Sequence, residues 1–335
     1  MRRKFIHALC SILICLMIMS CNKQSQNKEA TDQNSETEQI EIALIPKGTT
    51  HIFWNSVHAG AAKAAKELGV QIYWQGPLKE DDRQVQIQTI QNFISRGVDA
   101  IALAPLDARA LIPSVKTARS RNIPVVIFDS DLASEDYESF VATDNREGGR
   151  LSAKRLIEVL GGKGKVILLR YLEGSASNTH REEGFLEEMK KSGKGIEVIS
   201  SNQFAGVTIE KAFQASQNLL NRFPDVNGVF CPNEIVTQGM LRALQTANKA
   251  GKVKLIGFDA NESFITALEK DHIHGIALQD PFKMGYMTVK TATQLVKGEK
   301  VDKRIDTGVQ MVTKENMQTP EMQLLLRPEI DKWLQ

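Results

Sequence analysis

Residues 98–131 contain VDAIALAPLD and IPVVIFDSD, and residues 226–261 repeat the same pattern as VNGVFCPNE and VKLIGFDAN. In each copy, two apolar runs typical of buried strands end in polar residues, and a helical stretch separates them. The second run ends in Phe-Asp in both copies, at Asp129 and Asp259. The repeat predicts two similar α/β lobes. Polar loops at the carboxyl ends of their strands would meet across a cleft that binds a ligand.

The rest of the chain continues the alternation of apolar runs and amphipathic stretches, which is typical of βαβ units with parallel sheets. Each copy begins with a further apolar run, EIALIPKG from Glu41 and KVILLRYLEG from Lys165. The predicted fold is α/β, with two doubly wound, Rossmann-like parallel sheets. Strands are expected near residues 41–46, 70–74, 99–104, 124–128, 139–142, 165–170, 196–200, 227–231, 253–257, 275–278 and 306–313. Helices are expected near residues 54–68, 82–96, 108–121, 146–160, 178–191, 208–222, 235–248, 261–270 and 284–297.

The first twenty residues have the features of an export signal: a basic start and then an apolar run too short for a comfortable membrane span. The sequence Ile18-Met19-Ser20-Cys21 resembles a bacterial lipobox, so Cys21 is expected to be lipidated after cleavage. An ordinary signal peptide that contains a cysteine is the alternative. Residues 21–39 lack large apolar side chains beyond the anchor and are expected to form a flexible tether.

Length, net charge and cysteine content exclude several classes of protein. Nearly 300 residues follow the tether, which suits two domains better than one core. Residues 1–20 hold three basic and no acidic residues, so their removal changes the formal net charge from +2 to −1. This near-neutral chain without a basic run does not support nucleic-acid binding. Cys231 is then the one cysteine besides Cys21, so an intrachain disulfide or thiolate metal site is not expected.

Several segments occur in the order found in the sugar-binding proteins of ABC transporters, of the ribose/galactose-binding type. The chain resembles this family over roughly residues 40–315, through HIFWNSVHAG, LAPLDARAL, IPVVIFDSD, FVATDNREGG, HREEGF, FCPNE, LIGFDAN and LQDPFKMG. The resemblance implies the type I periplasmic binding protein fold, with a multi-strand hinge. It also implies that a sugar or sugar-like polyol binds between the lobes as they close.

In the first lobe, the resemblance assigns ligand contacts to residues at two loops. Phe53 and Trp54 match the family's paired aromatics, which suit the apolar faces of a sugar ring. His51 stands where a ligand-binding asparagine is common. Asp129 would accept hydrogen bonds from hydroxyls. Ser130 stands where ribose binders have an arginine, which argues against assuming ribose.

In the second lobe, the resemblance implies that Arg181 in HREEGF donates to ring oxygen and hydroxyl together. Asp259 would accept, and the amides of Asn233 and Gln279 would both donate and accept. Phe204 aligns, at loose spacing, with a stacking aromatic. Asn145 and Glu234 are weaker candidates. The structural alternatives are helix packing for the aromatics, loop capping for the aspartates and a solvated position for Arg181.

The expected organisation is a lipoprotein signal (1–20), a tether (21–39), lobe 1 (40–143 and 280–308), lobe 2 (144–279 and 309–315) and a helical tail (316–335). No cofactor, metal or catalytic residue is expected. His272 and His274 lack a nearby third ligand, and no GxGxxG follows the first strand.

The expected partners are a small sugar-like ligand and an ABC permease, with the protein a monomer anchored at the extracytoplasmic membrane face. A receptor that presents its ligand to a membrane sensor kinase is the alternative, and an α/β enzyme of the NAD type is less favoured. A DNA-binding regulator of the same two-lobe fold would need a helix-turn-helix where the signal and tether stand.

Overall fold

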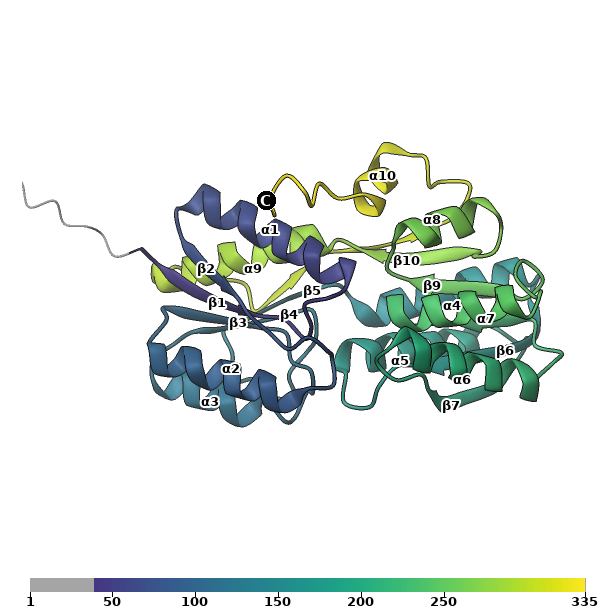
Figure 1. Ribbon diagram of the computed structural model, residues 1–335, viewed down its shortest axis with the longest axis horizontal. Coiled ribbons are helices and arrows are strands. Elements are labelled where there is room, and N and C mark those ends of the chain that lie inside the picture. The colour runs from purple at the N-terminus through teal and green to yellow at the C-terminus, as the bar shows by residue number, and fades with distance from the viewer. Residues whose placement is uncertain (1–38, 335) are drawn as a thin grey trace, which may run out of the picture. The chain divides into compact units, whose positions relative to one another are not determined.

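The computed structural model describes residues 39–334, and these residues form one compact unit with two six-stranded sheets (Figure 1). The predicted signal, the lipidation site Cys21 and the tether up to residue 38 lie outside the described residues. Ten helices and twelve strands alternate along the described chain. The predicted two-lobed, doubly wound α/β fold is confirmed.

The first sheet has the strand order β11-β5-β4-β3-β1-β2, and all its neighbours are parallel. Its strands are β1 (Glu41–Ile45), β2 (Gln71–Trp74), β3 (Ala100–Leu103), β4 (Val125–Phe128), β5 (Ser139–Ala142) and β11 (Arg304–Asp306). Helices α1 (Ile52–Leu68) and α9 (Pro281–Val296) cover one face, and α2 (Arg83–Arg96) and α3 (Ile112–Ser120) cover the other (Figure 1). Because both faces are covered, the central strands are apolar throughout.

The second sheet has the order β12-β10-β9-β8-β6-β7, with β12 antiparallel to β10. Its strands are β6 (Lys163–Arg170), β7 (Gly195–Phe204), β8 (Gly228–Phe230), β9 (Lys254–Phe258), β10 (Gly275–Gln279) and β12 (Val309–Val312). One face packs on α4 (Asn145–Val159) and α5 (Ala176–Ser192). The other packs on α6 (Ile209–Arg222), α7 (Glu234–Thr246) and α8 (Glu262–Glu269).

Close packing of α4 on α5 fixes the helix that carries Arg181. A Cβ atom at Gly149 would lie 2.0 Å from the carbonyl oxygen of Arg181, and one at Gly184 would lie 2.0 Å from that of Arg146. Both positions therefore require glycine. The two backbones approach closely enough to leave the start of α5 little freedom relative to α4.

The chain passes between the two sheets three times, between β5 and α4, between β10 and α9, and between β11 and β12. The last passage differs from the single strand predicted for residues 306–313. Gly308 has a φ of 88° and separates β11 from β12, so the predicted single strand is divided between two sheets. Thr143, on the first passage, donates to the carbonyl of Gly308 at 3.2 Å and holds two of the connections together.

The helix predicted for residues 108–121 begins later, at Ile112. The backbone before Ile112 is not free to form helix, because the amide of Ala108 donates to the carbonyl of Gly174 in the second lobe, at 3.1 Å. The tail contains one short helix, α10 (Pro320–Leu326). Between residues 39 and 334, no helix combines the length and apolarity needed to cross a membrane. The lobe boundaries inferred from the sequence stay a prediction.

Candidate functional site

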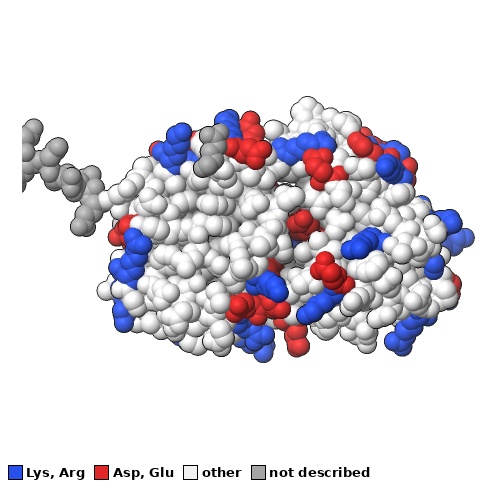
Figure 2. All heavy atoms as spheres, in the orientation of Figure 1, with Lys and Arg blue, Asp and Glu red and all other residues white. Residues whose placement is uncertain are grey.

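A cleft between the two lobes encloses about 370 Å³, part of it open to solvent. Figure 2 shows an acidic side chain at the bottom of the hollow between the two halves of the molecule. Eight of the ten sequence-predicted binding residues line the cleft: His51, Phe53, Trp54, Asp129, Arg181, Asn233, Asp259 and Gln279.

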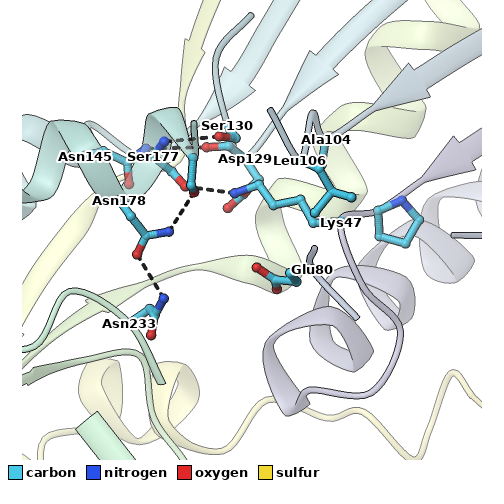
Figure 3. Close-up of polar contacts among 12 residues, drawn as sticks. Lys47, Glu80, Ala104, Leu106, Asp129, Ser130, Asn145, Ser177, Asn178 and Asn233 are labelled. Carbon is cyan, nitrogen blue, oxygen red and sulfur yellow. Dashed lines mark hydrogen bonds and ion pairs between the residues drawn. The ribbon is translucent and has the colours of Figure 1, made fainter. Parts of the chain in front are cut away.

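Asp129 follows β4 directly and has a φ of 59°, a left-handed conformation that aspartate tolerates better than most residues. Its Oδ2 lies 2.6 Å from the ammonium of Lys47, which follows β1. Both side chains are 3% exposed, so the pair is nearly cut off from water. Lys47 also donates to the hydroxyl of Ser177 in the second lobe, at 2.9 Å (Figure 3). The pair therefore joins two strand ends of one lobe to a helix start of the other.

Ser130 does not line the cleft; it is fully buried. Its hydroxyl accepts a hydrogen bond from the amide of Ser177 at 3.1 Å (Figure 3). The contact joins the loop after β4 to the start of α5. Ser130 therefore contributes to the contact between the lobes. The cation next to Asp129 is supplied by Lys47 instead.

Trp54 is 2% exposed and lies at the start of α1 beside Phe53, with the ring centroids 4.9 Å apart and nearly perpendicular. The Trp54 Nε1–H donates to Oε1 of Glu80 at 2.7 Å. The ring of His51 lies 3.5 Å from the same carboxylate. Trp54 lines the cleft and also packs into the hydrophobic core beneath α1. It can therefore contact ligand and support the helix at the same time.

Arg181 projects from the second turn of α5 and is 2% exposed. Its guanidinium donates to Oδ1 of Asn145 at 2.7 Å and to the carbonyl of Pro232 at 2.9 Å. It also lies over the ring of Phe258, 3.8 Å from the centroid. Burial lowers the pKa of Arg181, while the nearby aspartates raise it. Asn145, a weaker candidate from sequence, supports Arg181 and does not line the cleft.

Asp259 follows β9 in the same left-handed conformation as Asp129, with a φ of 64°. Burial raises the pKa of its carboxyl, and the charge of Arg181, 3.9 Å away, and a hydrogen bond from Gln279 oppose that rise. The Gln279 amide donates to Asp259 at 2.7 Å, whereas its Oε1 is buried with no partner among the described residues. A ligand hydroxyl could supply the missing donor.

Asn233 caps α7, since its Oδ1 accepts from the amide of Val236. Its Nδ2 donates to Asn178 at 3.0 Å (Figure 3). The next residue, Glu234, also lines the cleft, and its Oε2 is buried and unpartnered within residues 39–334. Burial raises the pKa of Glu234, and a hydrogen bond from Asn261 lowers it. A second acceptor is thus directed at the cleft.

Phe204 lies at the end of β7, 44% exposed, and is not part of the cleft lining. The guanidinium of Arg170 lies over its ring, 5.0 Å from the centroid. Tyr171, immediately after β6, is the aromatic residue of the second lobe that the structure places at the cleft. Phe204 pairs with Arg170 at the end of β6, but β7 is the edge strand of its sheet, whereas Tyr171 follows the inner strand β6.

Sequence reasoning missed Lys47, Glu80, Tyr171, Ser177 and Asn178, which also line the cleft. Two of them carried a usable signal: Tyr171 directly follows β6, as the predicted aspartates follow their strands, and Lys47 lies two residues after β1. Glu80 lies in a loop between β2 and α2 that no periodicity marks.

The side chains present are hydrogen-bond donors and acceptors with aromatic surfaces, a set that binds hydroxylated ligands. Cys231 is fully buried, and burial holds the pKa of its thiol well above its usual range, so it is not an activated nucleophile. In the described part of the chain, no three His, Cys, Asp or Glu residues are grouped as a metal site would require.

Comparison with known proteins places this architecture in a family. Residues 42–300 match the family described as periplasmic binding protein domain. The ribose import binding protein of Escherichia coli K12 is 31% identical over 278 residues, which cover 82% of this chain and 90% of that protein. The D-allose-binding periplasmic protein of the same organism is 29% identical, over 78% of this chain and 86% of that protein.

Solved structures agree. A carbohydrate transporter solute-binding protein from Agrobacterium radiobacter, in complex with D-arabinose, has a TM-score of 0.84 and 34% identity, covering 87% of this chain and all of that chain. An ABC transporter solute-binding protein from Agrobacterium vitis with bound D-fucose has a TM-score of 0.82 and 36% identity, covering 86% and 100%. The chain belongs to the type I periplasmic sugar-binding proteins of ABC transporters.

Proposed function

We propose that this protein captures a sugar or sugar-like polyol outside the cytoplasm and delivers it to an ABC permease. One observation carries the proposal: two aspartates at equivalent strand ends line the interlobe cleft together with Arg181, Asn233 and Gln279. Carboxylates, a guanidinium and amides together match hydroxyl groups, which both donate and accept. The relatives whose names include ribose, allose, arabinose and fucose support the same class of ligand.

Binding would close the lobes about the three connections, because only the closed form lets both lobes contact the ligand. Micromolar affinity would correspond to about −8 kcal/mol. Each ligand hydroxyl left unpaired in the closed cleft would cost about 1–3 kcal/mol, which would discriminate between epimers. The family consists of transporter substrate-binding proteins, and we propose that this chain likewise makes and breaks no bond.

A thermal-shift screen of the purified protein tests this function. The panel contains D-ribose, D-allose, D-arabinose, D-fucose, further hexoses, sugar alcohols and amino acids. A sugar at 100 times its Kd would stabilise the folded state by about 2.7 kcal/mol. We expect at least one sugar or sugar alcohol to raise Tm and to bind with one-to-one stoichiometry in calorimetry. A panel in which only amino acids raise Tm would overturn the assignment to sugars.

The lipid anchor is a separate proposal, supported by the sequence at Cys21 and the polar residues that follow. A lipidated Cys21 would hold a monomer at the extracytoplasmic membrane face, within reach of a permease. Expression in a bacterium with labelled palmitate tests it. Cys21→Ala should lose the label and release the protein from the membrane, and label retained on the variant would refute the anchor.

A further inference from the structure

The carboxylate of Glu80 accepts hydrogen bonds from two aromatic residues of the cleft. Trp54 Nε1–H donates to Oε1 at 2.7 Å, and the Tyr171 hydroxyl donates to Oε2 at 3.0 Å. All three residues line the cleft. Trp54 belongs to the first lobe and Tyr171 to the second, so a single side chain joins the aromatic surfaces of both lobes.

Glu80 is held to the first lobe. Its loop follows β2 and is tied to the loop between β1 and α1, where Thr49 donates to the carbonyl of Pro77 at 3.4 Å and Thr50 to that of Leu78 at 3.3 Å. A Cβ atom at Gly48 would lie only 3.1 Å from Cγ of Glu80. The side chain is therefore seated against the backbone of the first lobe, and its carboxylate moves with that lobe.

Tyr171 is equally firmly held to the second lobe. Its amide donates to Oε1 of Glu182 at 3.1 Å, its carbonyl accepts from the amide of Gly206 at 3.1 Å, and its ring belongs to the core of that lobe. Burial raises the pKa of the Tyr171 hydroxyl well above its usual range, so the group stays protonated and can donate.

We propose that Glu80 is a positioning residue that couples the first lobe to the second on closure, through its bonds to Trp54 and Tyr171. The inference rests on the proposed function, in which closure captures a sugar. Since the bond to Trp54 lies within one lobe, it persists in the open form. The bond to Tyr171 joins two lobes, so opening breaks it and water replaces the hydroxyl. Closure thereby supplies a donor to the second carboxylate oxygen and, through Glu80, connects Trp54 of the first lobe to Tyr171 of the second.

Tyr171→Phe tests the coupling, because it removes the hydroxyl and keeps the ring. In the variant, Oε2 of Glu80 has no hydrogen-bond donor from Tyr171 in the closed form, whereas the open form is unaffected. A hydrogen bond to a charged group is worth about 1.5–3 kcal/mol, which corresponds to roughly a 10- to 150-fold change. Sugars associate with the open form, so we expect the dissociation rate to rise at least tenfold, with an association rate within about threefold of wild type.

Tyr73→Phe is the matched control. The Tyr73 hydroxyl also contacts a carboxylate, that of Glu41, but both residues belong to the first lobe and lie outside the cleft. We expect its dissociation rate to equal that of wild type. Stopped-flow binding uses whichever of D-ribose, D-allose, D-arabinose and D-fucose raises the wild-type Tm.

A double-mutant cycle with Glu80→Ala separates coupling from general loss of packing. If the two side chains act through one bond, Tyr171→Phe should add little to the dissociation rate once Glu80 is alanine. Glu80→Gln, which keeps one acceptor oxygen, should fall between wild type and Glu80→Ala. Additive effects of the two changes, or an unchanged dissociation rate in Tyr171→Phe, would overturn the coupling through Glu80 and leave the proposed function untouched. Failure of every sugar to bind wild type would instead contradict the proposed function.

Discussion

The ammonium of Lys47 lies 2.6 Å from Oδ2 of Asp129, and both side chains are 97% buried. The two residues are 82 positions apart in the sequence and meet because β1 and β4 lie in one parallel sheet and end at the same edge. The lysine supplies a cation next to Asp129, whereas ribose binders have an arginine at the position of Ser130. The pair also anchors the first lobe to Ser177, across the cleft.

We expect Lys47→Met to lower the stability of the protein substantially. The change leaves Asp129 buried without its partner, a loss that costs about 3–5 kcal/mol in buried pairs. Lys165→Met is the control, since its partner Asp225 is exposed and water screens such surface pairs, so that they contribute little to stability. Denaturant unfolding measures both variants. Equal, small losses would show that water screens the Lys47–Asp129 pair.

Asp259→Asn is expected to weaken sugar binding about 10- to 100-fold with little change in Tm. The amide keeps the shape and tolerates the left-handed backbone, but it removes the charge that accepts ligand hydroxyls. Asp259→Ala should weaken binding and also lower stability by about 1 kcal/mol, because alanine is strained at a φ of 64°. Calorimetry and thermal melting separate the two effects. Full binding by Asp259→Asn would remove this carboxylate from the site.

Arg181→Ala should reduce both sugar affinity and the stability of the ligand-free protein. From sequence alone, Arg181 would be expected to contact ligand without supporting the fold. Its bonds to Asn145 and to the carbonyl of Pro232 argue otherwise, because the change leaves two buried acceptors unpaired at about 1–3 kcal/mol each. Melting of the ligand-free variant tests this. A Tm within one degree of wild type would mean that water replaces the guanidinium.

His274 should make the protein less stable as the pH falls from neutrality. Burial, together with the charge of Lys254, lowers the pKa of His274 to about 4, whereas the unfolded chain has the ordinary value near 6.5. The unfolded state therefore binds more protons in this range, and stability is fully present above pH 6.5 and lost as the pH falls towards 4. Arg155 and His272 reinforce the effect and Asp271 opposes it.

After allowance for screening of this partly exposed ring, the loss should be about 1–2 kcal/mol. Unfolding curves of wild type and His274→Gln at pH 7 and pH 5 provide the measurement. The variant should lose less stability than wild type over this interval. Parallel losses in the two proteins would assign the pH dependence to other groups.

Much of the site could be predicted because it follows a local rule. Asp129 and Asp259 directly follow apolar runs, and the carboxyl ends of parallel strands meet at one edge of a sheet. Lys47 and Tyr171 obey the same rule and were overlooked. Phe204 also stands at a strand end, but β7 is the edge strand of its sheet, and Phe204 does not line the cleft. In the sequence, the loose spacing around Phe204 was the one sign that its assignment to the site was weak.

The sequence by itself determined the alternation of strands and helices, the two-fold repeat and the polar strand ends, since each depends on periodicity within about thirty residues. Only the tertiary structure decided which side chains meet across the cleft. Glu80 and Tyr171 are 91 residues apart, and Lys47 and Ser177 are 130 apart. No local sequence pattern identifies such pairs, because their contact depends on how the two lobes lie against one another. Only the tertiary structure also decided that residues 304–312 are divided between the two sheets, since such a segment can pair with an edge strand of either sheet.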